Sequence, residues 1–512
     1  MKITYISHAT LLIETDGIKI LTDPWIFGPA YCEQWYQFPP PLEEAKSLLH
    51  DIDYVLLTHG HEDHLHHDTL VQINKSAHIY YPYSWYDGSK EYFQSIGFKK
   101  FTEGLNDKRY QLSKNVSFTY LANNLDNIIV LEDQEKVLVN VNDSLTSAPK
   151  ETIHYFLEKI NTKWKNVDYL LCSYGGASYY PNTIKAGWKN DREVGTIREQ
   201  FFLDNFCLIA NTINARFSIP FASDFVLLDD DQQWMNEIKT PRHDIESYFN
   251  TYYKDESSRT NIKVMYPGDQ AQDDVFLQRS AFHELLKQRP INELVLEIYK
   301  EQIAHKRNVS KLSHPNFITL FNKIKTHVEK KSYIIPEKKA AQLKFAIQLT
   351  DAPEEAWVEI NLKEAPLDNL VKLISAPDQT HVLQLKTKSK SLDYSISKEW
   401  GGDAIIIGYG CEITIFDKKT ILEELDNWAI QLLTNFPNTK EYVKRNPLRA
   451  VNYLMRDQIK RKVFLNKLTG HTSSYQFMDP ILKDHELWLT RSGCDICKKC
   501  NLPFISGDSK IN

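Results

Sequence analysis

The chain is poor in cysteine, has no long apolar run and carries little excess charge. Its 512 residues include seven cysteines, and Cys32, Cys172, Cys207 and Cys411 are isolated from one another, which argues against the disulfide framework of a secreted protein. No apolar run approaches the ~18–20 residues that a membrane span needs. Met1–Ile6 has the pattern of a strand and not of a signal peptide. A cytoplasmic protein with no membrane partner is expected.

The charge balance excludes nucleic acid as the main partner. A formal net charge of −6 provides no excess of basic residues for binding phosphates. The apolar fraction of 42% and the charged fraction of 25% are ordinary for a globular protein. Because 512 residues exceed the usual size of one core, two or three packed units are expected.

Strands and helices alternate along the first half of the chain. Leu11–Glu14 and Ile18–Leu21 form a predicted hairpin, and helical patterns follow at Glu151–Ile160 and Glu193–Ala210. The order of strands followed by helices occurs twice. This pattern predicts an α/β protein in which two sheets lie between helices, a four-layer αββα sandwich. The expected division is this sandwich at residues 1–275, a helical connection at 276–338, a β-rich α+β domain at 339–440, and a helical tail with clustered cysteines at 441–512.

Four later segments carry their own patterns. His314–Lys331 has the apolar stripe of an amphipathic helix, and Lys418–Asn435 is also expected to be helical. Ile262–Tyr266 is a predicted strand that ends the first unit. Ile405–Gly410 is interpreted as a buried strand framed by glycine turns.

The most informative segment is Thr58–His64, which directly follows the apolar run Tyr54–Leu57. It contains the pattern His-x-His-x-Asp-His at the end of a predicted strand. A backbone leaving the strand there can turn His59 and His61 toward one point, and Asp63 and His64 toward a second point nearby. Neutral imidazoles and a carboxylate in this arrangement indicate a site for one or two transition metals.

The same histidine motif after a strand resembles the metallo-β-lactamase fold, which also implies the αββα sandwich. Additional segments narrow the resemblance to the CMP-N-acetylneuraminate hydroxylase family and its bacterial relatives, over about residues 1–275. The matching segments are Ser7–Thr10, Asp23–Ala30 with Trp35 and Pro39–Pro41, Gly175–Ser178 with Pro181, Pro220–Ala222, and Trp234–Asn236.

This resemblance implies a site of two iron ions that activates dioxygen. Carried over residue by residue, His59, His61, Asp63 and His64 are metal ligands. Asp143 matches the carboxylate that can bridge two metals, although an Asn-Asp pair is also a common turn. Asp63, His64 and Asp143 are then the residues expected to act in catalysis.

One segment departs from the family pattern. The family usually has a His or Glu before the strand at Ile128–Val130, but Leu121–Asp126 contains neither. Either Asn124 or Asp126 serves as the ligand, or one metal binds weakly or not at all. Adjacent asparagines usually form turns. Asp126 stands at a position where the resembled family also carries Asp, so Asp126 is the candidate that we retain.

The ligand types do not identify the metal, because imidazole and carboxylate ligands suit zinc and iron alike. The first hypothesis is a cytoplasmic non-haem di-iron oxygenase that hydroxylates or N-oxygenates a small metabolite. The second is a zinc-dependent hydrolase of a lactone, ester or phosphodiester, in which zinc supplies a bound hydroxide. The third is a non-catalytic protein that keeps the fold.

The tail carries a second candidate metal site. Cys494, Cys497 and Cys500 form a C-x2-C-x2-C run, which suits zinc with a fourth ligand such as His485 or Cys411, or an iron–sulfur cluster. The resembled hydroxylase carries Rieske Cys and His ligands that are not found here, so an electron-donor protein is an expected partner besides the small-molecule substrate.

Three other polar features remain open. His8 is either a hydrogen-bond partner of a metal ligand or an ordinary buried histidine. Asp224 lies in an apolar segment and needs a partner. The acidic run 229–231 has the pattern of a solvated face.

Overall fold

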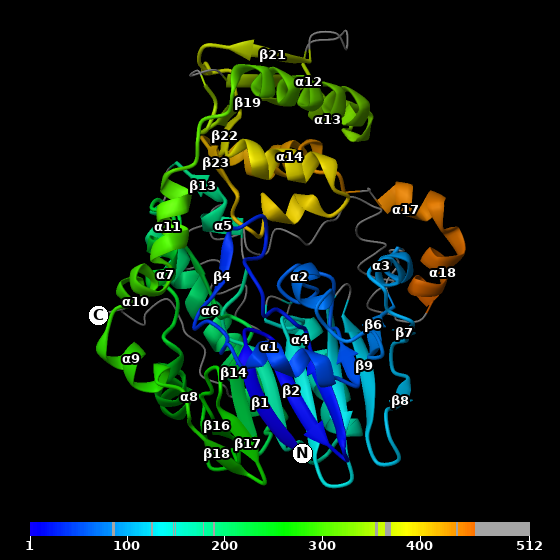
Figure 1. The fold of residues 1–512 in the computed structure, drawn as a ribbon. Helices are drawn as coiled ribbons and strands as arrows, with labels where there is room; N and C mark the ends of the chain where they lie inside the picture. The colour runs from blue at the N-terminus through cyan, green and yellow to red at the C-terminus, as the bar shows by residue number, and fades with distance from the viewer. Residues whose placement is uncertain are drawn as a thin grey trace.

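Two β-sheets packed face to face form the lower half of the molecule (Figure 1). The computed structural model describes residues 1–83, 88–123, 126–146, 148, 150–177, 179–187, 190–353, 357–363, 370–436 and 439–455. The first sheet has the order β18 (Val275–Leu277), β17 (Gln270–Gln272), β1 (Lys2–Ser7), β2 (Thr10–Thr15), β3 (Ile18–Thr22), β5 (Tyr54–Leu56), β6 (His78–Pro82), β7 (Lys100–Gly104). The second has the order β16 (Asn261–Ile262), β14 (Phe217–Phe221), β12 (Tyr169–Ser173), β11 (Val137–Asn142), β10 (Asp126–Glu132), β9 (Ser117–Asn123), β8 (Arg109–Gln111).

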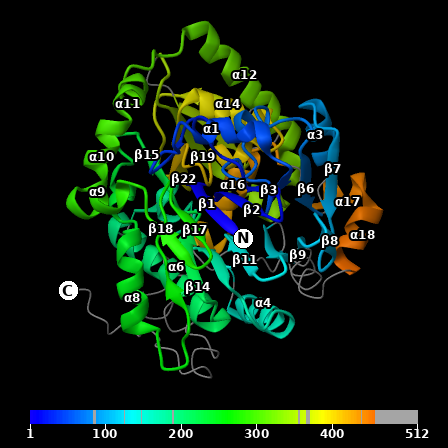
Figure 2. The same cartoon turned by 60° about the horizontal axis from the view of Figure 1, so that its bottom comes forward.

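The apolar residues of these strands explain the layers. Side chains from both sheets, such as Tyr5 and Leu171, share one core between them. The outer face of the first sheet packs on α1 (Ala45–Leu48), α2 (His67–Leu70) and α3 (Ser89–Ser95). The outer face of the second packs on α4 (Lys150–Lys163), α6 (Asp191–Ile213) and α8 (Ile245–Tyr252). Figure 2 shows α1 on one side of the strands and α4 and α8 on the other. The expected αββα sandwich is confirmed.

A third sheet lies above the sandwich in Figure 1 and belongs mainly to the later part of the chain. Its helices α12 (His314–Lys331), α14 (Ser389–Ser397) and α16 (Leu425–Leu432) bury their apolar faces on it. The helix predicted at 314–331 is confirmed. The order is β13 (Ile184–Ala186), β23 (Cys411–Ile415), β22 (Leu383–Thr387), β19 (Lys344–Leu349), β20 (Trp357–Asn361), β21 (Val371–Ile374).

Strand β13 connects the third sheet to the sandwich. It comes from the chain between β12 and α6, yet it pairs in parallel with β23, Ile184 opposite Ile413. A two-stranded ribbon of β4 (Trp35–Gln37) and β15 (Phe225–Leu227) also lies at this junction. The predicted limits of the four chain regions stay predictions.

Short helices make the remaining connections, and none of the described helices is long and apolar enough to cross a membrane. They are η1 (Leu49–Asp51), α5 (Tyr179–Asn182), α7 (Trp234–Glu237), η2 (Arg242–Asp244), α9 (Phe282–Gln288), α10 (Ile291–Ile298), α11 (Lys300–Arg307), η3 (Ser332–Ile334), α13 (Glu337–Ala340), η5 (Gly401–Ala404), α15 (Lys418–Leu422), α17 (Thr439–Arg445) and α18 (Pro447–Met455).

The strand predicted at Ile405–Gly410 is wrong. The chain folds back after η5, because the Gly410 N–H donates to the Ala404 carbonyl at 2.9 Å and the Gly408 N–H donates to the Asp403 carbonyl at 2.8 Å. A Cβ on Gly410 would lie 2.5 Å from the Ala404 oxygen, so this turn needs glycine there.

Two further element limits differ from the sequence prediction. The predicted helix 418–435 breaks into α15 and α16, since Glu424 adopts a left-handed conformation with φ 56°. The strand predicted at 262–266 is only the two-residue β16.

Candidate metal centre

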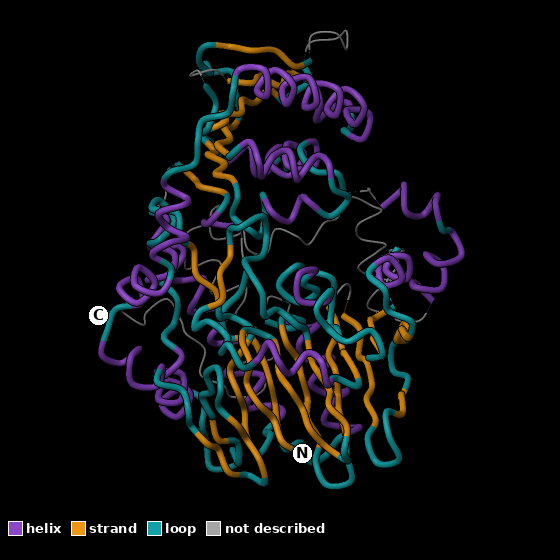
Figure 3. The backbone as a smooth tube through the Cα atoms, viewed as in Figure 1, coloured by secondary structure: helices purple, strands orange, loops and turns teal. Residues whose placement is uncertain are grey.

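The histidine-bearing loop leaves β5 at the edge where the sandwich faces the third sheet, among the loops in the middle of Figure 3. Asp23, which is fully buried, fixes the start of this loop: it accepts the Thr58 N–H at 2.7 Å and the Thr58 hydroxyl at 2.8 Å. The Asn142 amide, at the end of β11 in the other sheet, donates to Asp23 at 2.6 Å. One carboxylate therefore ties together the loops that both sheets contribute.

The first ligand group contains two imidazoles and one carboxylate. His59 Nε2 lies 2.7 Å from His61 Nδ1 and 3.9 Å from Asp126 Oδ1. All three ligating atoms lie within 4.8 Å of one another. Asp126 is brought here because β9 and β10 pair as a hairpin, with Asp126 opposite Asn123.

The second ligand group lies beside the first. His64 Nε2 is 3.2 Å from Asp63 Oδ2 and 3.2 Å from Asp143 Oδ2. The ring centroids of His59 and His64 are 4.1 Å apart, and His59, His64 and Asp143 also form a group within 4.8 Å. The six predicted positions outside the tail are therefore adjacent, while Asn124 lies outside the described residues.

The donor set fits divalent metal ions. Asp126 Oδ1 and Asp143 Oδ1 are buried, and neither has a hydrogen-bond partner among the described residues. Buried polar atoms without partners are rare in folded proteins. Three nitrogen donors and three carboxylates that converge in this way would be satisfied by cations.

Burial shifts the protonation of one ligand, His59, in the direction that metal binding needs. It holds the pKa of the buried His59 ring well below the usual value, and the neighbouring His64 and His61 rings lower that pKa further. The ring is therefore neutral and keeps a lone pair for a metal. Burial raises the pKa of Asp126. The nearby His61 lowers this pKa, and the Asp143 carboxylate raises it further.

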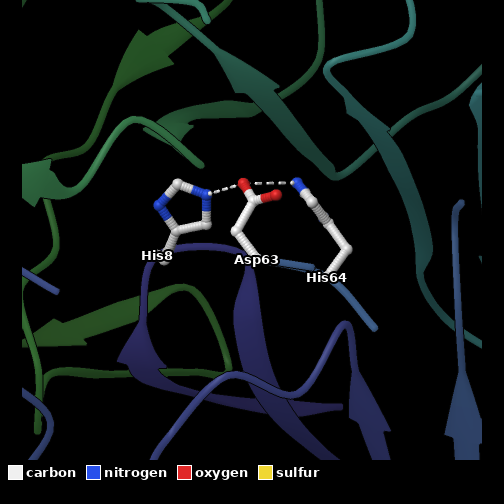
Figure 4. Close-up of side chains that lie close together, drawn as sticks. All are labelled: His8, Asp63 and His64. Atoms are coloured by element: carbon white, nitrogen blue, oxygen red, sulfur yellow. Dashed lines mark hydrogen bonds and ion pairs between the residues drawn. The ribbon is translucent and has the colours of Figure 1, made fainter. Parts of the chain in front are cut away.

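Neighbouring side chains hold the ligands in place. His8 Nε2 lies 2.9 Å from Asp63 Oδ2, on the side of the carboxylate away from His64 (Figure 4). The Tyr31 hydroxyl donates to the other carboxylate oxygen, Asp63 Oδ1. The Thr58 hydroxyl lies 3.0 Å from His59 Nδ1. Of the two interpretations of His8, the structure favours a partner of a metal ligand.

The later part of the chain also contributes to the centre. Asp403 in η5 interacts electrostatically with His61 and Asp63, and burial raises its pKa to about 6. Gly408 packs so closely that an added Cβ would lie 2.5 Å from Tyr31 Cβ. Sequence reasoning missed Tyr31 and Asp403, because only tertiary packing brings them to the histidine loop.

Other singled-out residues lie outside the ligand groups. Asp224 is ion-paired with Arg242 and accepts the Tyr5 hydroxyl, so its partner comes from the protein. The acidic run is not simply solvated, since Asp229 pairs with Lys306 at 2.8 Å and with Lys388.

Cys411 is not one of the ligands grouped at this centre. The buried Cys411 thiol donates to the Ile405 carbonyl at 3.0 Å. The predicted tail ligands Cys494, Cys497 and Cys500 lie outside the described residues, as does His485.

Residues 2–155 match the family model described as a β-lactamase superfamily domain. A protein of Mycolicibacterium smegmatis named as a Rieske 2Fe-2S iron–sulfur protein is 25% identical over 248 residues, 46% of each chain. The cytidine monophosphate-N-acetylneuraminic acid hydroxylase of Xenopus laevis is 26% identical over 245 residues, 44% of this chain and 38% of the hydroxylase. The chain matches less than half the length of these curated relatives.

One solved structure with a similar chain path is CmlA, a diiron β-hydroxylase from Streptomyces venezuelae. It has a TM-score of 0.36 and 15% sequence identity, and the match covers 54% of each chain.

Proposed function

We propose that this chain, whose residues 2–155 match a family model described as a β-lactamase superfamily domain, is a non-haem di-iron oxygenase. It uses dioxygen to hydroxylate a carbon or oxidise an amine nitrogen of a small metabolite. We propose a cytoplasmic location. We also propose an electron-donor protein as partner, because the reduction of dioxygen needs electrons that the substrate need not supply.

The ligand set is the observation that carries this proposal. His59, His61 and Asp126 provide two imidazoles and one carboxylate, a set typical of non-haem iron sites that react with dioxygen. Zinc hydrolases also use such a set, so the neighbouring group matters. It contains one imidazole and two carboxylates, and carboxylate-rich pairs of sites are typical of di-iron proteins.

The roles of the chain's own residues follow from their contacts. His59, His61 and Asp126 would hold one iron, and Asp63, His64 and Asp143 the other. Bound there, ferrous iron would supply the chemistry that binds and reduces dioxygen. Asp23 Oδ2 lies 3.3 Å from His64 Nδ1, and His8 and Tyr31 contact Asp63, so these three residues keep the ligand atoms oriented.

The curated relatives support the same reading. One of them is named as a hydroxylase and another as an iron–sulfur protein, both names of redox proteins. Since the match covers less than half of each relative, their substrates and electron sources are not carried over.

The proposal is tested by loading the full chain with iron without oxygen, and then measuring oxygen uptake with a panel of amines and amino acids. His61→Ala removes a ligand, and His67→Ala is the matched control, because His67 is exposed and its ring lies 3.1 Å from the Tyr92 hydroxyl, outside the ligand groups. We expect substrate-dependent oxygen uptake in the wild type and in His67→Ala, and none in His61→Ala.

The zinc hydrolase is the alternative outcome. Zinc retained through purification, with no iron uptake and with turnover of a lactone or ester, would replace the oxygenase proposal. Iron-loaded protein that consumes no oxygen with any compound of the panel would count against oxygen chemistry at this centre.

A further inference from the structure

Lys239 lies against an aromatic pair beside the candidate metal centre. Its ammonium is 3.1 Å from the centroid of the Phe225 ring and donates to the Phe225 carbonyl. Trp35 stacks on the Phe225 ring with centroids 3.5 Å apart and an angle of 1° between the planes. Because Trp35 covers one face of the ring at that distance, the ammonium lies on the other face.

Two buried ion pairs lie in the same region as this lysine. Arg198 pairs with Glu199 at 2.7 Å, and Arg242 pairs with Asp224. All four are between 4% and 7% exposed. Glu199, Asp224 and Arg198 are the charged groups whose fields act on Lys239.

These charges do not balance. Each of the two carboxylates already has an arginine, and Lys239 has no carboxylate within 4 Å in the described part of the chain. When Lys239 is protonated, three cations share two anions in this cluster. An ammonium has three donors, and the Phe225 carbonyl takes one of them.

An unbalanced buried cation is unfavourable. Burial lowers the pKa of Lys239 to about 7, so the folded protein disfavours the protonated ammonium at neutral pH. A fixed anion would remove this penalty through charge-assisted hydrogen bonds. The Lys239 residue as a whole is half-buried.

The cluster is adjacent to the metal centre. The Phe225 ring centroid lies 6.3 Å from that of His8, which in turn contacts Asp63 at 2.9 Å. The Tyr5 hydroxyl joins the two regions, since it lies within hydrogen-bonding distance of both Asp224 and the His8 carbonyl. A molecule bound at Lys239 could thus extend to the metal ligands past one aromatic ring.

We propose that Lys239 anchors an oxyanion, a carboxylate or a phosphate, of the molecule that the metal centre transforms. This inference rests on the proposed function for the reaction that follows binding. The anion site itself depends only on the charge imbalance and on the position of Lys239, and it limits the substrate class to anionic metabolites.

The test measures binding of acetate and of inorganic phosphate to the full iron-loaded chain, by calorimetry and by the shift in melting temperature. Lys239→Met removes the charge, and Lys239→Arg keeps it. Lys75→Met is the matched control, because Lys75 also donates to a carbonyl, that of Leu70 at 2.9 Å, and lies 4.2 Å from the centroid of the Phe98 ring.

We expect one or both anions to bind the wild type, Lys239→Arg and Lys75→Met. Lys239→Met should bind about tenfold or more weakly, with a correspondingly smaller rise in melting temperature. Preference between acetate and phosphate distinguishes a carboxylate from a phosphate ligand.

Equal anion affinity of Lys239→Met and Lys75→Met, both folded by circular dichroism, overturns the inference, as does a wild type that binds neither anion. If Lys239→Met does not fold, Lys239→Gln with the same titration replaces it. Repeating the series in a His61→Ala background separates the two proposals, because the Lys239-dependent binding should persist there even if the centre holds no iron.

Discussion

Replacing Tyr31 by phenylalanine isolates one hydrogen bond that orients a metal ligand. The Tyr31 side chain is 1% exposed, and its hydroxyl donates to Asp63 Oδ1. The variant removes this single oxygen and keeps the ring that packs against Gly408 and, with centroids 4.8 Å apart, against Trp35. Asp63 then keeps its contact with His8 Nε2 at 2.9 Å.

The magnitude follows from the charge on Asp63. A hydrogen bond to a charged group contributes about 1.5–3 kcal/mol, which corresponds to roughly 10- to 150-fold in an equilibrium constant. Partners of metal ligands typically change metal affinity by about 10- to 100-fold. We therefore expect Tyr31→Phe to bind iron about 10- to 100-fold more weakly, while the melting temperature of the metal-free protein changes much less.

The assay is anaerobic competition for ferrous iron with a coloured chelator. Tyr36→Phe is the matched control: Tyr36 is 8% exposed on the neighbouring strand β4, and its hydroxyl has no hydrogen bond to a described residue. Equal iron affinity of Tyr31→Phe and Tyr36→Phe would refute the reasoning, since the bond to Asp63 would then contribute nothing to the centre.

Three further predictions concern other parts of the chain. Burial raises the pKa of Asp426 from 3.8 to about 7, so the stability that its protonated form contributes is complete below pH 3.8 and is lost as the pH rises through 7. Asp426→Asn should therefore raise the free energy of unfolding by up to about 4 kcal/mol at pH 8 and hardly at pH 4. Urea titration at the two pH values measures this difference. Gly408→Ala places a Cβ 2.5 Å from Tyr31 Cβ and should cost about 1–3 kcal/mol in thermal unfolding together with iron affinity, whereas Gly187→Ala, with its nearest atom at 3.5 Å, should be nearly neutral. Replacing the three clustered tail cysteines by serine should remove one separate metal equivalent by elemental analysis, and unchanged stoichiometry would refute a tail site.

The sequence was most informative where the chemistry is local. His59, His61, Asp63 and His64 lie within six positions after one strand, so their spacing alone predicts that they converge. Asp126 reaches the centre because β9 pairs with β10. The alternating apolar pattern predicts these two strands, but it does not predict where Asp126 lies relative to the histidine loop. Hydrophobic periodicity likewise predicted the αββα layers, because each layer buries its own stripe.

Long-range contacts could not be predicted in this way. Asp403 approaches His61 only because the later sheet packs above the sandwich, and β13 joins that sheet from a distant part of the sequence. The apolar run after Asp403 has the composition of a strand, yet close contact of Gly408 and Gly410 with Ala404 makes it a turn. The sequence likewise does not single out Lys239, because only the structure shows that Arg198 and Arg242 pair with the neighbouring carboxylates of Glu199 and Asp224.

The central claim is that the histidine loop and three carboxylates together hold two metal ions, and elemental analysis of the iron-loaded chain tests it most directly. We expect about two irons per chain in the wild type, and a loss of bound iron without unfolding in both His61→Ala and Asp63→Ala. Full iron content in both folded variants would contradict the assignment of this centre.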